Sequence, residues 1–453
     1  MVPGPENGEQ SGRRAPEGED DMQDVMRSGS KKIALRLLPL LCLGYVAAYL
    51  DRINVSFAAL QLNEDLSLSP AAYGLGAGLF FAGYVLFEVP SNLILRRVGA
   101  KLWISRIMIS WGIISALTAF VHNEITFYLC RFLLGIAEAG FLPGVILYLN
   151  QWLLPRDRAR ALSVLASSTA VAGLVGSPLS MWLLGMDGLW GVRGWQWLFA
   201  LEGIPAVVLG VLVLLVLPNT PMAAKWLTDG EKSALQGALD KEAGYLELHQ
   251  FNLLGRSLFW KAGLLGTVYF CMVLGMYGVA FWMPQILKDV LGGTDLSLLG
   301  WYNAIPFLAA ILGMLAIGWS SDRLGERKLH VIGALVLASV GCVLAGMATG
   351  LVGTLVALSL ALIGLWSVIG PFWAFTTARM GGLAAAVGVA LINSIGNTGG
   401  FFGPYIMGGL KSATADYRVG LYVLALVLIV GVVSMALVRG DKPAAQVTAP
   451  PHR

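Results

Sequence analysis

Four charged residues lie within two strongly apolar stretches of this sequence. Asp51 and Arg52 are adjacent, near the end of an apolar stretch that begins at Ile33. Arg131 and Glu138 lie seven residues apart in another stretch, so a helix would place both on one face, about 10 Å apart along its axis. A charge within a membrane costs about 2.5 to 3.5 kcal/mol on insertion scales. We therefore expect these four side chains to face protein or water rather than lipid.

Two acids and two bases at such positions could carry protons and bind an anion. A buried carboxyl group can exchange a proton when burial favours its neutral form and no arginine holds it ionised. We therefore predict that Asp51 and Glu138 are the proton-coupling residues. The alternatives are a fixed network of salt bridges that orients the helices and, for Asp51 and Arg52, a helix end that contacts lipid headgroups.

Arginine suits an anionic substrate, because its planar donors can bind a carboxylate through two parallel hydrogen bonds. On a helix Tyr45, Tyr49 and Arg52 are spaced i, i+4 and i+7 and share one face. Asp51 points about 100° away from this face, toward a neighbouring helix. Arg52 is therefore the first candidate for the substrate carboxylate, with Tyr49 beside it. Arg131 is the second candidate, unless it restrains one of the two acids.

The composition is that of a membrane protein. Of 453 residues, 57% are hydrophobic and 13% are charged, and the mean hydropathy is +0.71. Soluble domains have about 25% charged residues. Apolar stretches of about 20 residues are long enough to cross a bilayer as helices. They predict an all-α protein with twelve spans at 33–56, 72–95, 102–121, 125–150, 160–184, 195–217, 258–287, 297–320, 330–349, 352–377, 383–409 and 418–438.

The longest polar connection separates six predicted spans from the next six. The segment before the first span is rich in Gly, Glu, Asp, Arg and Pro, which is typical of disorder, and it is too polar for a cleaved signal peptide. The predicted parts are a disordered N-terminus at 1–30, a first half at 31–217, a linker at 218–256, a second half at 257–439 and a tail at 440–453.

Lysine and arginine gather in the loops on one side of the predicted membrane. They are Lys31, Lys32, Arg36, Arg96, Arg97, Lys101, Arg156, Arg158, Arg160, Arg323, Arg327 and Lys328, together with the lysines of the linker. The other side is poor in bases, with Arg193, Lys288, Lys411 and Arg418 as exceptions. Short basic loops stay in the cytoplasm. Both termini and the linker are therefore predicted to be cytoplasmic, in a multi-pass protein of the cell inner membrane.

The cysteines and histidines give no pattern of a reactive centre. The four cysteines lie within apolar stretches without paired spacing, and the four histidines lie in loops or at the edges of spans. Neither pattern is that of a disulfide framework or a metal site. A membrane-embedded enzyme would need a metal cluster or a nucleophile with its base. We therefore predict no enzymatic activity, no metal, no cofactor and no nucleic-acid partner.

The two halves carry similar sequence features at matching positions. Asn92–Lys101 follows the second span, and Gly318–Lys328 follows the eighth. Gly140–Pro143 lies in the fourth span, and Gly370 precedes a proline in the tenth. Glycine lets membrane helices approach closely, and proline kinks them. Recurrence in both halves indicates an internal repeat of two six-helix units.

The loop Gly318-x-x-x-Asp322-Arg323-x-Gly325-x-Arg327-Lys328 resembles the loop signature of the major facilitator superfamily. The first-half copy departs from the signature, with Arg96 in place of its Asp. From Lys31 to Arg439 the chain is most similar, within that superfamily, to the anion:cation symporter family. The stretches that carry this resemblance are Tyr49–Asn54, Phe80–Asn92 and Arg131–Gly140. Gly194–Gly203 and Ala224–Thr228 resemble the branch of bacterial organic-acid permeases for tartrate, phthalate and hydroxyphenylacetate.

The resemblance implies the twelve-helix major facilitator fold and a monomeric carrier. It also implies import of an organic anion with one or more protons by alternating access. The acids that match the family's proton carriers are Asp51 and Glu138. Tyr84 is implied to face the substrate, whereas Glu88, four residues on, is expected to be structural.

The second half has almost no charge within its spans, so a neutral polar wall would face the charges of the first half. The resemblance favours Trp373 and Asn393 as substrate contacts there. The alternative for each is hydrogen bonding between helices or anchoring at the interface. At the cytoplasmic edge Asp322, Arg323 and Arg327 would form a gate that locks the two halves together on the inside.

Other functions stay open at this stage. An organophosphate:phosphate antiporter, or another anion exchanger without proton coupling, would be expected to present bases from both halves. The seventh span contains only Lys261, at its edge. A non-transporting membrane sensor is an alternative of another class. Tartrate-like hydroxy acids, sugar acids and aromatic acids all remain open as substrates.

Overall fold

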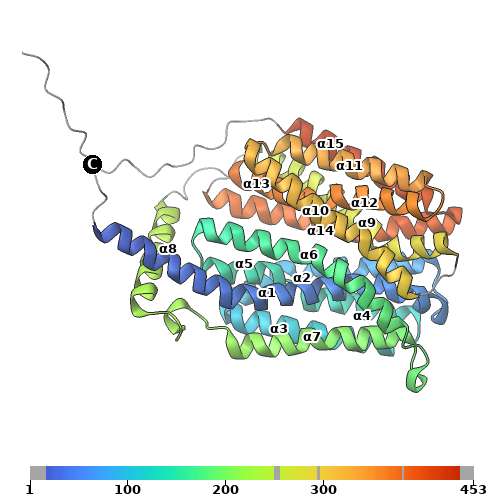
Figure 1. Ribbon diagram of the computed structural model, residues 1–453, viewed down its shortest axis with the longest axis horizontal. Coiled ribbons are helices and arrows are strands. Elements are labelled where there is room, and N and C mark those ends of the chain that lie inside the picture. The colour runs from blue at the N-terminus through green and yellow to red at the C-terminus, as the bar shows by residue number, and fades with distance from the viewer. Residues whose placement is uncertain (1–16, 249–255, 293–295, 380–381, 439–453) are drawn as a thin grey trace, which may run out of the picture.

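The computed structural model describes residues 17–248, 256–292, 296–379 and 382–438, which form helices and turns without a β-strand. The helices run along the long axis of the molecule in two groups (Figure 1). The first group is α1 (Glu17–Asp65), α2 (Pro70–Val98), α3 (Ala100–Leu117), α4 (Glu124–Glu138), α5 (Phe141–Asn150), α6 (Pro155–Leu184) and α7 (Gly194–Val216). The second group is α9 (Arg256–Leu291), α10 (Leu296–Leu324), α11 (Lys328–Met347), α12 (Leu351–Ser367), α13 (Ile369–Arg379), α14 (Gly382–Thr414) and α15 (Arg418–Leu437).

Eleven helical stretches of the described chain are long and apolar enough to cross a membrane. They coincide with eleven of the twelve predicted spans. The remaining predicted span, 383–409, coincides with α14, which packs along α9 and α2. The predicted all-α membrane fold with two six-helix halves is therefore confirmed.

The start of α1 differs from the predicted disorder of 1–30. The structure describes this segment from Glu17 onward, and it is helical from there. Acidic residues fill the first turns of the helix, where the helix dipole favours negative charge. Residues 1–16 and the predicted tail at 440–453 lie outside the described residues.

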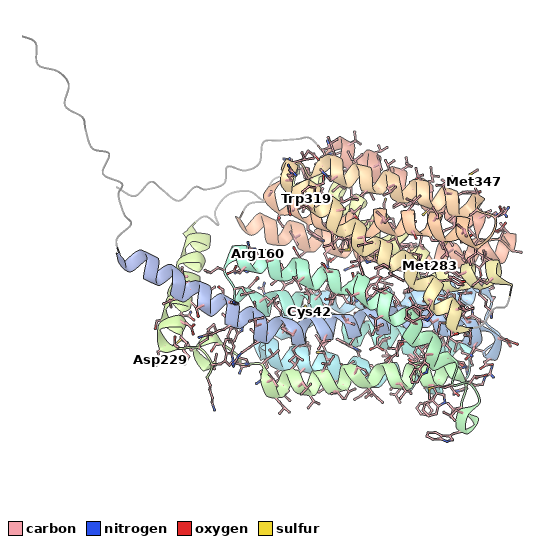
Figure 2. The ribbon with its side chains drawn as sticks, viewed as in Figure 1. Cys42, Arg160, Asp229, Met283, Trp319 and Met347 are labelled. Atoms are coloured by element: carbon pink, nitrogen blue, oxygen red, sulfur yellow. The ribbon has the colours of Figure 1, made fainter. Side chains whose placement is uncertain are left out.

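The linker contains one helix, α8 (Asp229–Leu248), which lies across the start of α1 at one end of the molecule, here called the linker end (Figure 1). We define the linker junction as Ser28, Lys32 and Glu231. Lys32 Nζ lies 2.7 and 3.0 Å from the two Glu231 oxygens, and Ser28 Oγ donates to the same carboxylate at 2.8 Å. The hydrogen bond from Lys32 is the main cause that lowers the pKa of Glu231 to about 2. Figure 2 marks Asp229, where α8 begins.

The two halves meet through α2 against α14 and α6 against α10. Glycine permits the close approach of α2 and α14, since a Cβ atom on Gly74 would lie 2.5 Å from the carbonyl oxygen of Pro404. Nearby, the Tyr73 hydroxyl donates to the carbonyl of Phe281 on α9 at 3.0 Å. The end of the molecule opposite α8 is therefore closed by direct contacts between the halves.

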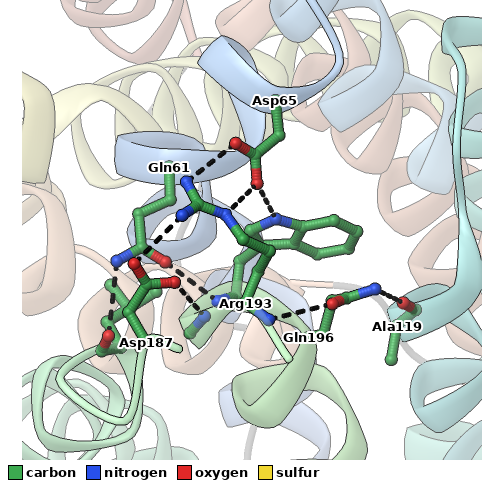
Figure 3. Close-up of polar contacts among 9 residues, drawn as sticks. Gln61, Asp65, Ala119, Asp187, Arg193 and Gln196 are labelled. Carbon is green, nitrogen blue, oxygen red and sulfur yellow. Dashed lines mark hydrogen bonds and ion pairs between the residues drawn. The ribbon is translucent and has the colours of Figure 1, made fainter. Parts of the chain in front are cut away.

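The same end of the first half is held by hydrogen bonds around Arg193 (Figure 3). Its guanidinium donates to both oxygens of Asp65 at 2.7 and 2.8 Å, and to Asp187 at 3.1 Å. Trp195 Nε1 donates to the same Asp65 carboxylate at 2.7 Å. The network ties the end of α1 to the start of α7. Arg193 is one of the bases on the side of the membrane that was predicted to be poor in bases. Two carboxylates offset its charge there.

Two of the predicted spans are each built from two helices. The fourth span consists of α4 and α5, and the chain turns between them at Gly140, whose φ of +87° favours glycine. A side chain there would overlap Ser91 Oγ on α2. The tenth span consists of α12 and α13, interrupted at Val368. The break in the fourth span comes directly after Glu138, so α4 ends at a predicted site residue.

Candidate functional site

Arg52 is bonded from both halves of the molecule. One guanidinium nitrogen forms an ion pair with Glu138 of α4, and the other terminal nitrogen donates to the hydroxyl of Tyr277 on α9 at 2.9 Å. The guanidinium carbon lies 5.2 Å from the ring centre of Phe80 and 5.5 Å from that of Tyr84, both on α2. Arg52 therefore joins a carboxylate of the first half to a phenol of the second.

Glu138 is the last residue of α4, and its side chain is 1% exposed. A carboxylate at this position meets the negative end of the helix dipole. Arg52 offsets the charge at one oxygen, whereas Oε2 has no hydrogen-bond partner among the described residues. Gly135, one turn earlier, packs directly against the backbone of Phe80 and holds α4 on α2. The charge of Glu138 therefore depends chiefly on Arg52.

Arg131 lies on α4 and is fully buried. Its guanidinium carbon lies 5.3 Å from the centre of the same Phe80 ring. In the described chain none of its three guanidinium nitrogens has a hydrogen-bond partner. A buried cation without such partners is costly. Arg131 is thus the base in the site whose donors are available to an anion.

Asp51 points away from Arg52 and contacts α3. Its direction agrees with the one expected from helix geometry. Trp111 Nε1 donates to Oδ2 at 2.9 Å, and Ser115 Oγ donates to Oδ1 at 2.6 Å. Asn54 Nδ2 lies 3.4 Å from Oδ1. The side chain is fully buried, and no described base forms an ion pair with it. Asp51 therefore lies behind Arg52, among neutral donors.

The two predicted tyrosines lie beside Arg52. Tyr84 contacts its guanidinium directly, as described above. Tyr49 is 2% exposed, and its ring centre lies 6.5 Å from those of Tyr277 and Trp366. Its hydroxyl lacks a hydrogen-bond partner among the described residues. We define the central cluster as Tyr49, Arg52, Tyr84, Arg131, Glu138 and Tyr277.

The predicted contacts of the second half lie on α13 and α14. Asn393 Nδ2 donates to Glu88 Oε1 of α2 at 2.6 Å, which is a hydrogen bond between the halves. Trp373 packs against Tyr269 on α9, with ring centres 5.1 Å apart. Glu88 is 4% exposed, and its second oxygen lacks a partner within the described chain. In this structure Asn393 thus makes the hydrogen bond between helices that was its alternative role, with Glu88 as the partner.

The predicted gate residues lie at the linker end of α10 and in the loop that follows it. Arg327 pairs with Asp322 at 2.6 Å and donates to Ser321 Oγ at 2.9 Å, and the Arg323 guanidinium lies 5.2 Å from the ring centre of Trp319. The Asp322 side chain is 74% exposed. All of these contacts are within the second half, so they do not bring the halves together in this structure.

Two surface hollows lie away from the central cluster. One, of about 300 Å³, is lined by Met181, Trp182 and Gly185 of the first half and by Leu296 of α10. The other, of about 280 Å³, lies between α3 and α7. Neither contains a predicted site residue. In the part of the chain that the structure describes, no three His, Cys, Asp or Glu side chains are grouped so as to hold a metal ion.

Sequence reasoning missed several polar residues around the site. Trp111 and Ser115 are side chains of an ordinary membrane helix, and their spacing gave no signal. Glu202 of α7 is different, because it is a lone carboxylate inside an apolar span, which is the same signal that identified Asp51.

Comparison with known proteins agrees with this architecture. The model of the family described as "Major Facilitator Superfamily" matches residues 41–404. The chain is 44% identical, over 90% of its length, to a protein of Agrobacterium vitis named "Putative tartrate transporter", 94% of which is covered. It is 40% identical, over 91% of its length, to a protein of Acinetobacter baumannii named "Quinolone resistance transporter", 94% of which is covered.

The fold also matches that of the xylose transporter XylE from E. coli, with a TM-score of 0.72 at 13% identity. The match covers 90% of this chain and 98% of that one. The family match and the relatives named as transporters define a multi-pass membrane transporter rather than an enzyme. The chain belongs to the major facilitator superfamily.

Proposed function

We propose that the protein imports an organic anion together with protons by alternating access, across the cell inner membrane. The observation that carries the proposal is the arrangement of the two buried arginines. Arg131 has guanidinium donors without partners, and Arg52 is held by a single carboxylate. The relative named for tartrate transport supports an organic acid as the substrate class. Tartrate-like hydroxy acids, sugar acids and aromatic acids all fit this chemistry.

The substrate carboxylate would bind Arg131 and compete with Glu138 for Arg52. A guanidinium presents a limited fork of donors, so it cannot hold two carboxylates as well as one. When Glu138 takes up a proton, it loses its charge and its ion pair with Arg52 is broken. The donors of Arg52 can then form hydrogen bonds with the substrate carboxylate. Proton binding and anion binding therefore favour each other, which is the requirement for symport. Tyr49 and Tyr84 would orient the anion beside Arg52.

Asp51 is the second proposed proton-coupling residue. It adjoins Arg52 in sequence but faces the donors of α3, so it does not compete for the substrate. Its protonation would change the balance of charge around Arg131 and Glu138, with which it interacts electrostatically. The four central charges sum to zero, and an entering monoanion with one proton would preserve that balance.

Alternating access would use the contacts at the two ends of the molecule. The end opposite α8 is closed, whereas the contacts of Asp322, Arg323 and Arg327 stay within the second half. We propose that these three residues form the gate that closes the linker end in the other state. Asn393 and Trp373 would contact the substrate from the second half, and Asn393 would then exchange its bond to Glu88 for one to the substrate.

We also propose that both termini and α8 face the cytoplasm and that the carrier acts as a monomer. The basic residues at the linker end support this orientation. Two of the four bases that depart from the pattern have acidic partners, since Arg193 pairs with two carboxylates and Lys411 lies 3.5 Å from Asp289.

The function is tested by uptake of labelled organic acids into proteoliposomes, with an inward proton gradient switched on or off. The panel contains tartrate, a sugar acid, an aromatic acid and an organophosphate. We expect one of the carboxylates to accumulate above its outside concentration only with the gradient. A protonophore should abolish that accumulation. Equilibration that ignores the gradient, or exchange of the organophosphate alone, would contradict the proposal.

A further inference from the structure

Glu202 is a buried acid that the proposed cycle does not yet use. It lies on α7, is 5% exposed, and accepts a hydrogen bond from Ser180 Oγ of α6 at 2.7 Å through Oε1. Its other oxygen, Oε2, has no hydrogen-bond partner among the described residues. No described base forms an ion pair with it. A carboxyl group in such a place is far cheaper to bury neutral than charged.

Asn54 lies between Glu202 and Asp51. Its amide nitrogen is 3.4 Å from Asp51 Oδ1, and the same side chain interacts with the Glu202 carboxyl. Asn54 is fully buried, and its own Oδ1 has no donor in the described chain. Two buried acceptors, Glu202 Oε2 and Asn54 Oδ1, therefore lack a donor in two side chains that interact. A proton on Glu202 would turn its carboxyl group into a donor.

Asp51 and Glu202 receive different numbers of hydrogen bonds. Asp51 receives hydrogen bonds from Trp111 and Ser115 of α3 in addition to the amide of Asn54. Glu202 receives one short bond, from Ser180, and the weaker contact from Asn54. Donors favour the ionised form of a carboxyl group, so the arrangement favours a charged Asp51 and a neutral Glu202. The other charged groups near this pair are Glu138 and Arg131, which face Asp51 from α4.

We propose that Glu202 is a third proton-carrying residue of the transport cycle, and that Glu202 and Asp51, on either side of Asn54, hold one proton between them behind the substrate site. When Asp51 is ionised, the shared proton resides on Glu202. When a second proton reaches Asp51 from the substrate side, both carboxyl groups are neutral. The pair can then release one proton on the far side without ever holding two buried negative charges.

The position of Ser180 gives this pair a connection to the other half. Ser177 lies three residues before Ser180 on α6, and its Oγ accepts a hydrogen bond from Asn303 Nδ2 of α10 at 2.9 Å. Asn303 is 1% exposed, and its Oδ1 is unsatisfied among the described residues. Proton release would leave a charged carboxylate on Glu202, which accepts a stronger hydrogen bond from Ser180. Ser180 lies one helical turn from the contact between Ser177 and Asn303, which joins the halves. The inference rests on the proposed proton-coupled function.

The test compares proteoliposomes that contain wild type, Glu202→Gln, Glu202→Asp or the control Glu124→Gln, which changes an exposed acid at the start of α4. Proton and anion movement are recorded together, with a trapped pH dye and labelled tartrate, or the panel acid that wild type accumulates. We expect Glu202→Gln to exchange anion normally but to shift the pH midpoint of proton-driven uptake, because Asp51 then binds and releases its proton without a second carboxyl group beside it. The control should keep the wild-type midpoint.

An unchanged pH profile of uptake in Glu202→Gln would overturn the inference. A wild type without any proton movement would instead overturn the proposed function, so the two failures are distinct. If Glu202→Gln does not fold, Glu202→Asp decides, because a proton carrier with a shortened side chain should shift the pH midpoint of uptake. A midpoint identical to that of wild type would also overturn it. Infrared difference spectra with and without anion should show a neutral-carboxyl band in the wild type that Glu202→Gln lacks.

Discussion

Two arginines contact the same ring, Phe80, but differ in what their donors reach. Arg52 bonds to Glu138 and Tyr277, whereas Arg131 has no hydrogen-bond partner among the described residues. The sequence placed both in membrane spans, because intramembrane charge is rare enough to mark function. It did not indicate which acid pairs with which base. Two acids and two bases from helices far apart in sequence can pair in more than one way, and only packing selects one.

Arg131→Lys should weaken anion binding while leaving the fold intact. Lysine keeps the charge but loses the planar fork that binds a carboxylate through two hydrogen bonds. Loss of one charge-assisted hydrogen bond costs about 1.5 to 3 kcal/mol. We therefore expect the KM for the transported acid to rise on the order of 10- to 100-fold, measured by initial uptake rates.

The matched control is Arg106→Lys, since Arg106 lies on α3, 3.9 Å from the ring centre of Trp103 and away from the central cluster. Its KM should equal that of wild type. A normal KM in Arg131→Lys would show that Arg131 does not hold the substrate.

At the scale of the element, the break between α4 and α5 positions Glu138. The hydropathy of the chain predicted the fourth span as one unit, and Gly140 with Pro143 indicated an irregularity in it. The exact end of α4 at Glu138 was not predictable, because it depends on Gly140 meeting Ser91 of another helix. The helical start of α1 was missed for a related reason. Composition alone indicated disorder there, whereas the helix is held by Glu231, about 200 residues away.

Gly140→Ala should destabilise the protein more than Gly188→Ala does. Both glycines have the left-handed conformation, with φ of +87° and +80°, where an alanine costs about 1 to 2 kcal/mol. A Cβ atom on Gly140 would also overlap Ser91 Oγ, whereas one on Gly188 meets nothing within 4 Å. Overpacking of this kind adds about 1 to 3 kcal/mol.

Thermal unfolding in detergent measures the difference. We expect a lower Tm for Gly140→Ala than for Gly188→Ala, together with slower anion exchange, because Glu138 lies two residues before Gly140. Equal Tm values for the two variants would mean that the contact with Ser91 does not fix the break.

At the scale of the molecule, the linker junction joins α8 to the first half. The pKa of Glu231 lies at about 2, below its ordinary value of 4.5, chiefly because of Lys32. A lowered carboxyl pKa stabilises the folded state above the ordinary pKa, and that contribution is lost as the pH falls toward 2.

Glu231→Gln should therefore lower the Tm at pH 7 and lose this effect in acid. Ion pairs of this kind contribute about 1 kcal/mol, so we expect a decrease of about 2 °C. The difference from wild type should narrow below pH 4.5 and be nearly absent only at about pH 2 and below. Asp229→Asn is the matched control on α8, because Asp229 is fully exposed and its contact with Lys232 is 3.4 Å long. A difference from wild type that stays constant with pH would contradict this role of Glu231.

In the proposed carrier, which the two halves form together, Arg52 pairs either with Glu138 or with the substrate carboxylate. The twelve spans and their division into halves followed from hydropathy, which is a strong signal in membrane helices. The contacts between halves did not follow from it. Gly74 against Pro404 and Asn393 against Glu88 depend on how two six-helix units dock, and no local pattern encodes that docking.

The central claim is that proton and anion are coupled through the competition of Glu138 and substrate for Arg52. The most direct measurement compares wild type and Glu138→Gln proteoliposomes, first for accumulation driven by a proton gradient and then for anion exchange without one. We predict that Glu138→Gln loses accumulation and keeps exchange, because a permanently neutral side chain frees Arg52 but carries no proton. Accumulation that survives in Glu138→Gln at the wild-type level would contradict the account, and Glu138 would then be a fixed structural partner of Arg52.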